Sequence, residues 1–348
     1  MNLRAWLDTL SSRSFSIPVV ILYVTEGCNL RCCMCSYRHP QPGELSLREL
    51  ASLAEQLAGY GLRHIVYSGG EPLLRSDFPA ICELFGRHGV KQSLLTNGVL
   101  LEQRLPEIGR HFREIIVSLD GPDAATHDSI RGGVSFERAV RGIKAARIAA
   151  PAGRSISLRT VLQKKNYRMM SRMVDTARSL GVGRISFLAA DLLSGAFGRD
   201  QHGSAPEPGG WKQEVMLDAS ELQEFREIVS ALVSSRRREF QERFISEPPA
   251  KLFHIVEYFE AVAGIRPFPR NHCNAPNVSA VITSTGEVRP CFFLPGYANV
   301  REESVRTLSN GSGIRATRRN VNEYTLERCA TCVCTLHVGH AASLLDRF

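Results

Sequence analysis

Between residues 18 and 190, short β-rich runs alternate with amphipathic helical segments, and this alternation limits the folds open to the chain. Strands and helices in this order form βαβ units on a parallel sheet. The segment 46–61 is typical, because Ser46 and Glu49 form a capping-box pattern at its start. We predict strands over 18–25, 63–68, 91–97, 114–120, 155–163 and 184–190, and helices over 46–61, 77–88, 102–110, 135–149 and 167–180. Periodicity alone does not distinguish an open doubly wound sheet from a partial barrel.

The composition changes after this region. Residues 198–213 are rich in glycine and proline and have no apolar period, which is typical of a loop or linker. A helical region is expected over about 219–262, and short strands and turns from 265 onward indicate a smaller second unit. The predicted organisation is an N-terminal extension (1–17), an α/β unit (18–197), a linker with a helical region (198–264) and a small α+β unit (265–348).

Composition excludes several classes of protein. No apolar run reaches the roughly 18 residues of a membrane-spanning helix, and charges interrupt the N-terminus where a signal peptide needs an apolar stretch. We therefore expect a cytoplasmic protein without a membrane partner. The formal net charge is +8, but the basic residues are spread along the chain without an RNA-binding motif. We interpret them as a solvated surface, with no nucleic-acid partner, although an anionic substrate would also suit this charge.

Nine of the ten cysteines fall into two groups. The first group is Cys28, Cys32, Cys33 and Cys35, and the second is Cys273, Cys291, Cys329, Cys332 and Cys334. In a reducing compartment, clustered cysteines are more often metal or cluster ligands than disulfides. Cys82 stands alone on a predicted apolar helix face, and we expect it in the core.

The first group follows the first predicted strand directly. Cys28, Cys32 and Cys35 are spaced C-x3-C-x2-C at the carboxyl end of that strand, where parallel α/β proteins build their active sites. Three thiolates are one short of the four that complete a zinc site or a four-iron cluster. This pattern favours a [4Fe–4S] cluster with one iron open to a ligand, although a zinc site remains an alternative.

Three further motifs follow the next three predicted strands. They are SGGEP (68–72), TNG (96–98) and SLDG (118–121). In a parallel arrangement they would converge on one mouth together with the cysteine loop. Gly69 and Gly70 would let the backbone approach a ligand closely, and Glu71 brings a carboxylate. Each motif alone is typical of an ordinary turn.

Together, the C-x3-C-x2-C loop and the GGEP motif closely resemble the radical S-adenosylmethionine (radical SAM) superfamily over about residues 18–190. The resemblance implies a partial (β/α)6 barrel and a [4Fe–4S] cluster on Cys28, Cys32 and Cys35. The open iron of that cluster would chelate the amino and carboxylate groups of SAM. An external one-electron reductant, such as flavodoxin or ferredoxin, would supply the electron.

The resemblance also implies which residues contact SAM. They are Met34, Gly69, Gly70, Glu71, Asn97, Ser118, Asp120 and Arg159. Met34 would lie near adenine, and Glu71 with its two glycines would hold the methionine amine. Ser118 and Asp120 would contact the ribose or face the substrate. Arg159 would pair with the methionine carboxylate. Arg131 is an alternative residue for this role. Arg131 could instead brace a loop through an ion pair.

The second cysteine group resembles the SPASM/twitch domains that follow some radical SAM barrels. The resemblance rests on the run from Gly286 to Cys291, with Cys273 upstream and the pair Cys329 and Cys332 downstream. The cysteine content fits the shorter twitch form, which implies one auxiliary [4Fe–4S] cluster on Cys273, Cys291, Cys329 and Cys332. A structural zinc ribbon with the same four ligands is the rival interpretation.

The predicted activity is reductive cleavage of SAM to a 5′-deoxyadenosyl radical that abstracts a hydrogen atom from a substrate C–H bond. We expect a small polar, sugar-like metabolite that is dehydrogenated or epimerised, because only about 17 residues precede the first strand and leave no room for a leader-binding domain. A peptide maturase is one alternative. An iron–sulfur electron-transfer or scaffold protein is another.

Two further residues are candidates for catalysis. Asp191 follows the sixth predicted strand and could act as a base on a substrate hydroxyl, or simply as a helix cap. Cys334 could return a hydrogen atom to a substrate radical, replace Cys332 as a ligand, or have no role in the reaction. Cys33 is a weaker candidate for the same hydrogen transfer.

Overall fold

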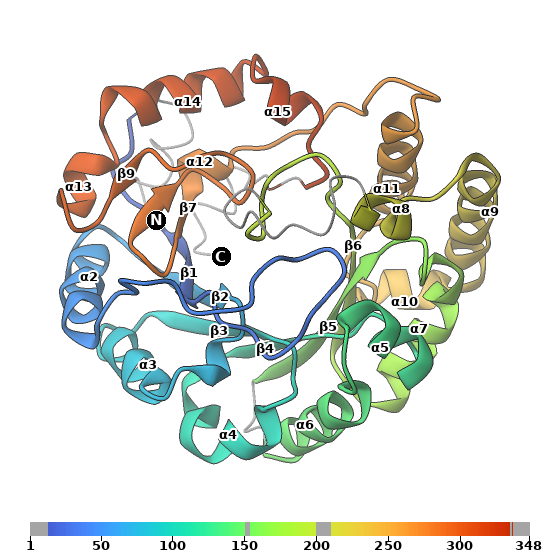
Figure 1. The fold of residues 1–348 in the computed structure, drawn as a ribbon, viewed down its shortest axis with the longest axis horizontal. Coiled ribbons are helices and arrows are strands. Elements are labelled where there is room, and N and C mark those ends of the chain that lie inside the picture. The colour runs from blue at the N-terminus through green and yellow to red at the C-terminus, as the bar shows by residue number, and fades with distance from the viewer. Residues whose placement is uncertain (1–12, 150–153, 200–209, 335, 337–348) are drawn as a thin grey trace.

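Six parallel strands form one curved sheet in the computed structural model, which describes residues 13–149, 154–199, 210–334 and 336 (Figure 1). The strands are β1 (Val19–Thr25), β2 (His64–Gly69), β3 (Lys91–Thr96), β4 (Glu114–Ser118), β5 (Ser155–Leu162) and β6 (Arg184–Ala189). Each strand pairs with the one before it in the sequence, so the order β1 to β6 never reverses. A doubly wound sheet would reverse at a switch point. The fold is therefore the partial barrel, and the predicted α/β class is confirmed.

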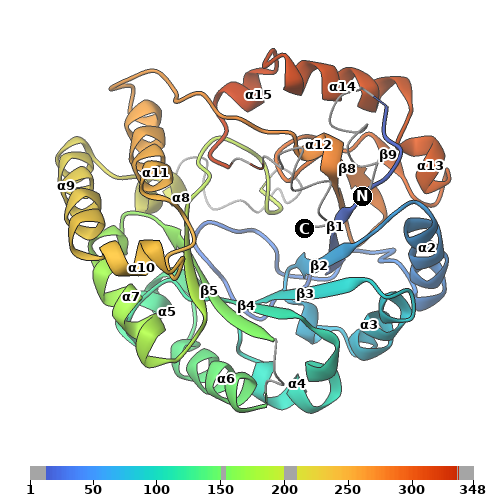
Figure 2. The same ribbon diagram turned by 180° about the vertical axis from the view of Figure 1, so that it is seen from behind.

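Helices cover the outer face of this barrel (Figures 1 and 2). They are α2 (Leu47–Gly59), α3 (Phe78–Gly86), α4 (Leu101–Ile108), α5 (Ala124–Arg131), α6 (Phe136–Ile148) and α7 (Met170–Ser179), with short 3-10 turns η1 (Pro72–Leu74), η2 (Gly109–His111) and η3 (Tyr167–Met169). The capping box of α2 is confirmed, since Glu49 N–H donates to Ser46 Oγ and Ser46 N–H donates to Glu49 Oε2. Helix α5 was not predicted. It begins where the Asp123 carboxylate accepts from Thr126 N–H (2.9 Å).

The helical region that follows protects the free edge of β6. It contains α8 (Gly210–Val215), α9 (Ala219–Ser235), α10 (Arg237–Gln241) and α11 (Pro249–Val262). Between α10 and α11, Ser246 N–H donates to Ile185 O (2.9 Å), and the Glu247 carboxylate accepts from Phe187 N–H (2.8 Å). Covering an edge strand in this way prevents it from pairing with another chain.

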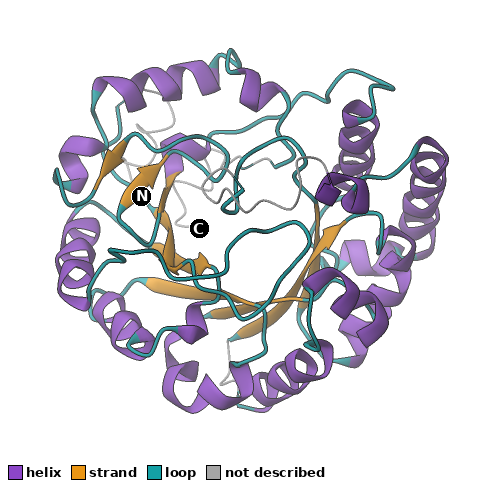
Figure 3. Cartoon of the chain, viewed as in Figure 1, coloured by secondary structure: helices purple, strands orange, loops and turns teal. Residues whose placement is uncertain are grey.

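The C-terminal strands extend the same sheet on its other side. They are β7 (Ser279–Ile282), β8 (Glu287–Arg289) and β9 (Ala298–Asn299), which accompany α12 (Ala275–Val278), α13 (Val305–Leu308), α14 (Ser312–Asn322) and α15 (Glu327–Ala330). Strand β7 pairs in parallel with β1, and β8 and β9 follow as antiparallel strands. The small α+β unit predicted from residue 265 thus shares one nine-stranded sheet with the barrel (Figure 3).

The core lies between the sheet and the outer helices. The Tyr67 ring contacts the rings of Phe78, Phe85 and Phe112, with centroid separations of 5.2 to 6.1 Å. Cys82, on α3, is fully buried in this layer, which confirms its predicted place in the core. Among the described helices, none is both long and apolar enough to cross a membrane. The predicted N-terminal extension lies largely outside the described residues, as do residues 200–209 of the predicted linker.

Candidate functional site

The cysteine loop begins where β1 ends and packs against the loop that follows β2. Gly70 N–H donates to Thr25 O, and Glu71 N–H donates to Gly27 O, both at 2.8 Å. A Cβ atom on Gly70 would lie 2.1 Å from Gly27 O, and one on Gly69 (φ +112°) would lie 2.3 Å from Thr25 O. The structure therefore explains these glycines by the close approach of two loops of the chain itself, whereas the sequence suggested the approach of a ligand.

Two arginines hold the carbonyl groups of the cysteine loop. Arg38 donates to Tyr37 O (2.6 Å) and to Cys35 O (2.7 Å). Arg199, in the loop after β6, donates to Met34 O (2.9 Å). Because Met34 and Cys35 are adjacent, these contacts fix the backbone at the third cysteine from two sides. Neither arginine was predicted as a site residue.

Asp191 holds Arg199 in this position. The two side chains form a buried ion pair, and each is 7% exposed. The Asp191 carboxylate also accepts from the N–H groups of Leu193 and Ser194 (3.3 Å). It therefore caps a turn after β6, where the sequence suggested a base or a helix cap. As placed, its oxygens bind groups of the chain itself.

The three cysteines of the loop are partly shielded from water: Cys32 is buried, and Cys28 and Cys35 are half-buried. Cys28 and Cys35 pack against Tyr23 and Tyr37 on one side and against Leu30 on the other. Burial raises the pKa of Cys28 to about 11 and that of Cys35 to about 12. The nearby Cys32 contributes to both of these rises in pKa. Because metal ligands must be deprotonated, binding of a metal or cluster would release the protons of these thiols.

Glu71 joins two of the predicted motifs. Its side chain is fully buried and accepts from Leu73 N–H (3.1 Å), Thr96 Oγ1 (2.8 Å) and Asn97 N–H (2.8 Å). Burial raises its pKa to about 7, although the three donors oppose this shift. Asn97 in turn donates to Asn29 Oδ1 in the cysteine loop (2.7 Å). The GGEP and TNG motifs therefore form one hydrogen-bonded unit with that loop.

Asp120 is buried and does not face an open site. Its Oδ1 accepts from Val161 N–H (2.8 Å), and its Oδ2 lies 2.6 Å from Arg131 Nε. The Asp120 N–H donates to His127 Nδ1 (3.1 Å). Arg131 Nη1 lies 3.9 Å from Cys32 Sγ. Arg131 thus forms the bracing ion pair that the sequence offered as one of its two roles.

Arg159 lies opposite Ser118 in the register of β4 and β5. Burial lowers the pKa of Arg159, despite the nearby Cys334 and Glu247. Its buried Nε has no hydrogen-bond partner within the described part of the chain. Ser118 is half-buried at the end of β4. Of the two arginines that compete for a carboxylate, Arg159 is therefore the one whose Nε is still available.

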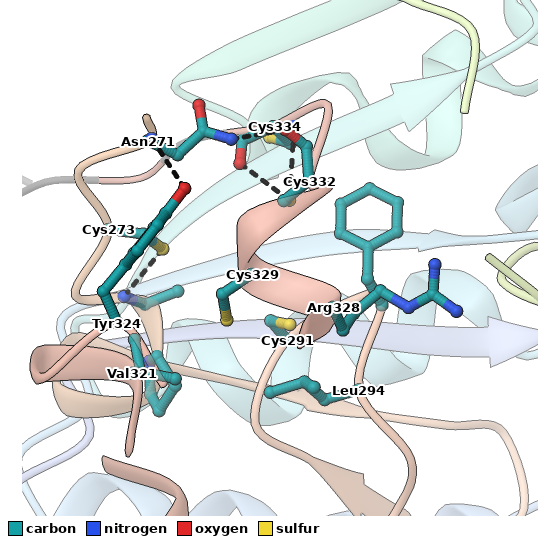
Figure 4. Close-up of a pocket in the computed structure, with 13 residues that line it drawn as sticks. Asn271, Cys273, Cys291, Leu294, Val321, Tyr324, Arg328, Cys329, Cys332 and Cys334 are labelled. Carbon is teal, nitrogen blue, oxygen red and sulfur yellow. Dashed lines mark hydrogen bonds between the residues drawn. The ribbon is translucent and has the colours of Figure 1, made fainter. Parts of the chain in front are cut away.

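Five C-terminal cysteines line one pocket together with residues of α12 (Figure 4). They are Cys273, Cys291, Cys329, Cys332 and Cys334. Apolar side chains including Phe293, Leu294 and Val321 complete the lining. Burial, with a smaller contribution from the neighbouring Cys273 and Cys329, raises the pKa of Cys291 to about 12. The sequence grouped these five cysteines and predicted four as ligands, with Cys334 as a possible replacement for Cys332; the structure brings all five to one pocket.

Two family models match these two regions of the chain. Residues 22–177 match the radical SAM superfamily, and residues 273–333 match SPASM, an iron–sulfur cluster-binding domain. The chain belongs to the radical SAM superfamily. Radical SAM enzymes carry a [4Fe–4S] cluster that works with SAM, and the SPASM domain adds an auxiliary iron–sulfur site. The SPASM match therefore favours an auxiliary iron–sulfur site over the zinc ribbon in this region of the chain.

The curated relatives of this radical SAM enzyme are named for different activities. An AdoMet-dependent heme synthase from Methanosarcina barkeri is 27% identical over 319 residues, which are 89% of this chain and 86% of the relative. The mycofactocin maturase MftC from Mycobacterium tuberculosis is 30% identical over 81% of this chain and 66% of its own length.

Solved structures share the fold. SuiB of Streptococcus suis, bound to the precursor peptide SuiA, aligns with a TM-score of 0.64 at 16% identity, covering 100% of this chain and 77% of SuiB. The enzyme anSMEcpe, with bound AdoMet and the Cp18Cys peptide, aligns with a TM-score of 0.64 at 17% identity, covering 90% of this chain and 85% of that chain.

The cysteine loop of this radical SAM enzyme suits its cluster chemically. It presents three thiols on one loop, and apolar side chains such as Leu30 and Val99 pack against them. An iron–sulfur cluster needs thiolate ligands, and an apolar shell limits access of water to it. Within the described ranges, no three Cys, His, Asp or Glu side chains are placed close enough together to hold one metal ion.

Several contacts of this site carry no strong sequence signal. Met34 Sδ accepts from Gln163 Nε2 (3.2 Å), and Cys33 Sγ lies 3.4 Å from Gln163 Oε1. Cys332 Sγ donates to Cys334 O (2.9 Å) and accepts from Cys334 N–H (3.4 Å), so either thiol could complete the auxiliary site. Gln163 lies 129 positions from Met34 and 130 from Cys33, and only the fold brings these residues together.

Proposed function

We propose that this enzyme performs a net two-electron oxidation of its substrate. The radical made at the Cys28, Cys32 and Cys35 site would take a hydrogen atom from a C–H bond. The substrate radical would then give one electron to the auxiliary site. The observation that carries this proposal is the presence of two separate groups of cysteines, one on the loop after β1 and one in a pocket, in parts of the chain that share one continuous sheet.

When bound, the [4Fe–4S] cluster supplies the electron that breaks a carbon–sulfur bond of SAM. The chain holds and orients the reactants. Glu71, fixed by Thr96 and Asn97, would direct a carboxylate oxygen toward the methionine amine. Arg159 would bind the methionine carboxylate through the nitrogen that has no partner among the described residues. Leu30 and Val99 would keep water away from the thiols.

Four sulfurs of the auxiliary pocket would hold one [4Fe–4S] cluster. Cys273, Cys291 and Cys329 would supply three of them, and Cys332 would supply the fourth, with Cys334 as its competitor. A cluster with four thiolate ligands has no iron open to substrate, which suits electron acceptance. If Cys332 is the ligand, Cys334 remains as a thiol beside the site. It could then return a hydrogen atom, and the reaction would be a redox-neutral epimerisation.

We propose a peptide as the first substrate class to test. MftC is named a maturase, AlbA of Bacillus subtilis is named a bacteriocin biosynthesis protein, and SuiB and anSMEcpe have been solved with peptides bound. The sugar-like metabolite predicted from the sequence finds no counterpart among these names. A small-molecule substrate is the second candidate, because two heme synthases match over 86% and 87% of their own length.

The test of the activity is release of 5′-deoxyadenosine from SAM by reconstituted protein under reducing, oxygen-free conditions. We expect release by the native chain and none by a Cys28→Ala variant. No release by the native chain, with both iron sites filled, would support the scaffold alternative instead.

The substrate class is tested with the same assay in the presence of cell extract. The extract is divided by a size-cut-off membrane, and each fraction is used with and without protease treatment. A peptide substrate predicts that the retained fraction stimulates release and that protease abolishes the stimulation. A stimulating fraction that passes the membrane and survives protease would favour the small-molecule candidate.

A further inference from the structure

Helix α5 ends directly against the cysteine loop. Arg31 N–H donates to Arg131 O (3.0 Å), and Cys33 N–H donates to Ile130 O (3.1 Å). Gly132 follows with φ +72°, and a Cβ atom there would lie 2.1 Å from Arg31 O. These two hydrogen bonds, one on each side of Cys32, therefore fix the end of α5 relative to this cysteine.

The Arg131 side chain points from this helix end to the Cys32 thiol. Its Nη1 lies 3.9 Å from Cys32 Sγ, and its Nε lies 2.6 Å from Asp120 Oδ2. The Arg131 side chain is 11% exposed, and that of Asp120 is fully buried. Asp120 is itself held by Val161 N–H at its other oxygen and by His127 at its own N–H. The guanidinium is thus held in one orientation, with one nitrogen toward the carboxylate and another toward the sulfur.

We propose that Arg131 tunes the reduction potential of the SAM-binding cluster and that Asp120 is its positioning residue. A cation beside a ligand sulfur stabilises the more negative, reduced state of a cluster, and an N–H group directed at that sulfur acts in the same direction. Shielding from water makes the effect stronger than it would be at the surface. The native arrangement therefore makes the cluster easier to reduce.

The step concerned is a one-electron reduction. An external one-electron reductant is oxidised by one electron, and the cluster with its three thiolates becomes more negative by one charge. No proton or bond is exchanged. This role differs from binding the methionine carboxylate, because it operates whether or not SAM is present.

The experiment is a potentiometric titration of the full-length reconstituted protein without SAM, followed by electron paramagnetic resonance. Arg131→Gln removes the charge but retains an N–H donor, and Arg131→Lys retains a charge without the planar fork. We expect Arg131→Gln to lower the reduction equilibrium constant of the cluster at least tenfold. This corresponds to a shift of the reduction potential to more negative values by about 59 mV for one electron. We expect Arg131→Lys to shift it less. Arg172→Gln is the control, because Arg172 pairs with Asp123 at the surface and is 60% exposed.

A native potential in Arg131→Gln, with iron content equal to that of the native chain, would overturn the proposal. An equal shift in Arg131→Lys and Arg131→Gln would also overturn it, because the effect would then come from loop structure and not from charge. If Arg131→Gln does not retain iron, Arg131→Met, which also removes the charge, is titrated in its place and compared with Arg131→Lys. A negative shift supports the proposal, and an unchanged potential contradicts it.

Discussion

At the scale of single residues, buried ion pairs within the chain hold the cysteine loop. Asp191 pairs with Arg199, Asp120 lies beside Arg131, and both pairs are shielded from water. Removal of one partner from such a pair leaves an uncompensated charge in a poorly hydrated environment. The contacts that hold the cysteine loop should therefore be sensitive to single substitutions.

Asp191→Asn is expected to destabilise the metal-free protein by about 3–5 kcal/mol, because Arg199 would lose its counter-charge. The double variant Asp191→Asn with Arg199→Met should recover most of this loss, since no unpaired charge remains. Urea unfolding of the four proteins in a double-mutant cycle measures the coupling. A single variant as stable as the native chain would show that the ion pair does not hold this loop.

His127 makes the free energy of unfolding depend on pH with a defined sign. Burial, followed by the charge of Arg131, lowers its pKa from 6.5 to about 4, and its Nδ1 accepts from Asp120 N–H. The neutral ring contributes stability above pH 6.5, and this contribution is lost as the pH falls toward 4. At pH 5 the native chain should have lost about 2 kcal/mol of this contribution.

His127→Gln isolates the effect, because glutamine can accept the same hydrogen bond and does not titrate. We expect the stability difference between native and variant chains to shrink by about 2 kcal/mol between pH 7.5 and pH 5. Urea unfolding of the metal-free proteins at the two pH values measures it. A difference that stays constant with pH would mean that His127 titrates normally.

At the scale of elements, the loops after β1 and β2 require glycine at their contact. Gly70→Ala should cost about 3 kcal/mol or more and lower the iron content, because its Cβ atom would displace the backbone at Gly27. Gly59→Ala is the matched control. It ends α2 with open space around it, so alanine should be neutral or stabilise by about 0.4–1 kcal/mol. Equal behaviour of the two variants would contradict this packing argument.

Strand-helix alternation predicted all six barrel strands and five of the six barrel helices, because their cores are apolar and their spacing is regular. The cysteine loop and the GGEP motif could also be recognised from the sequence, because the residues that would bind the cluster and SAM lie close together in the chain. Arg199, Arg131 and Gln163 were not predicted as partners of that loop. Their contacts depend on the tertiary fold, and a single sequence carries no local pattern for them.

At the scale of the whole molecule, the barrel and the auxiliary region share one sheet. The β7 strand uses the edge of β1 that β2 leaves free, so the auxiliary pocket is attached to the barrel by main-chain hydrogen bonds. Central strands of a sheet open only with the whole fold. The two sites should therefore not move independently as separate domains.

Amide hydrogen exchange tests this rigidity. We expect the amides of β7 to be protected as strongly as those of β1 and β2, because all three strands are central in the nine-stranded sheet. The two-residue strand β9 lies at the edge and should exchange faster. Fast exchange throughout β7, with slow exchange in β1, would indicate that the C-terminal region opens as a separate unit.

The central claim is that one chain carries two iron–sulfur sites built from different cysteines. Its most direct test is the iron, sulfide and zinc content after oxygen-free reconstitution of the native chain and of a Cys28/Cys32/Cys35→Ala triple variant. The account predicts about eight irons per native chain and about four in the variant, with matching sulfide. About four irons in the native chain and almost none in the variant, with zinc retained in both, would contradict the auxiliary iron–sulfur site.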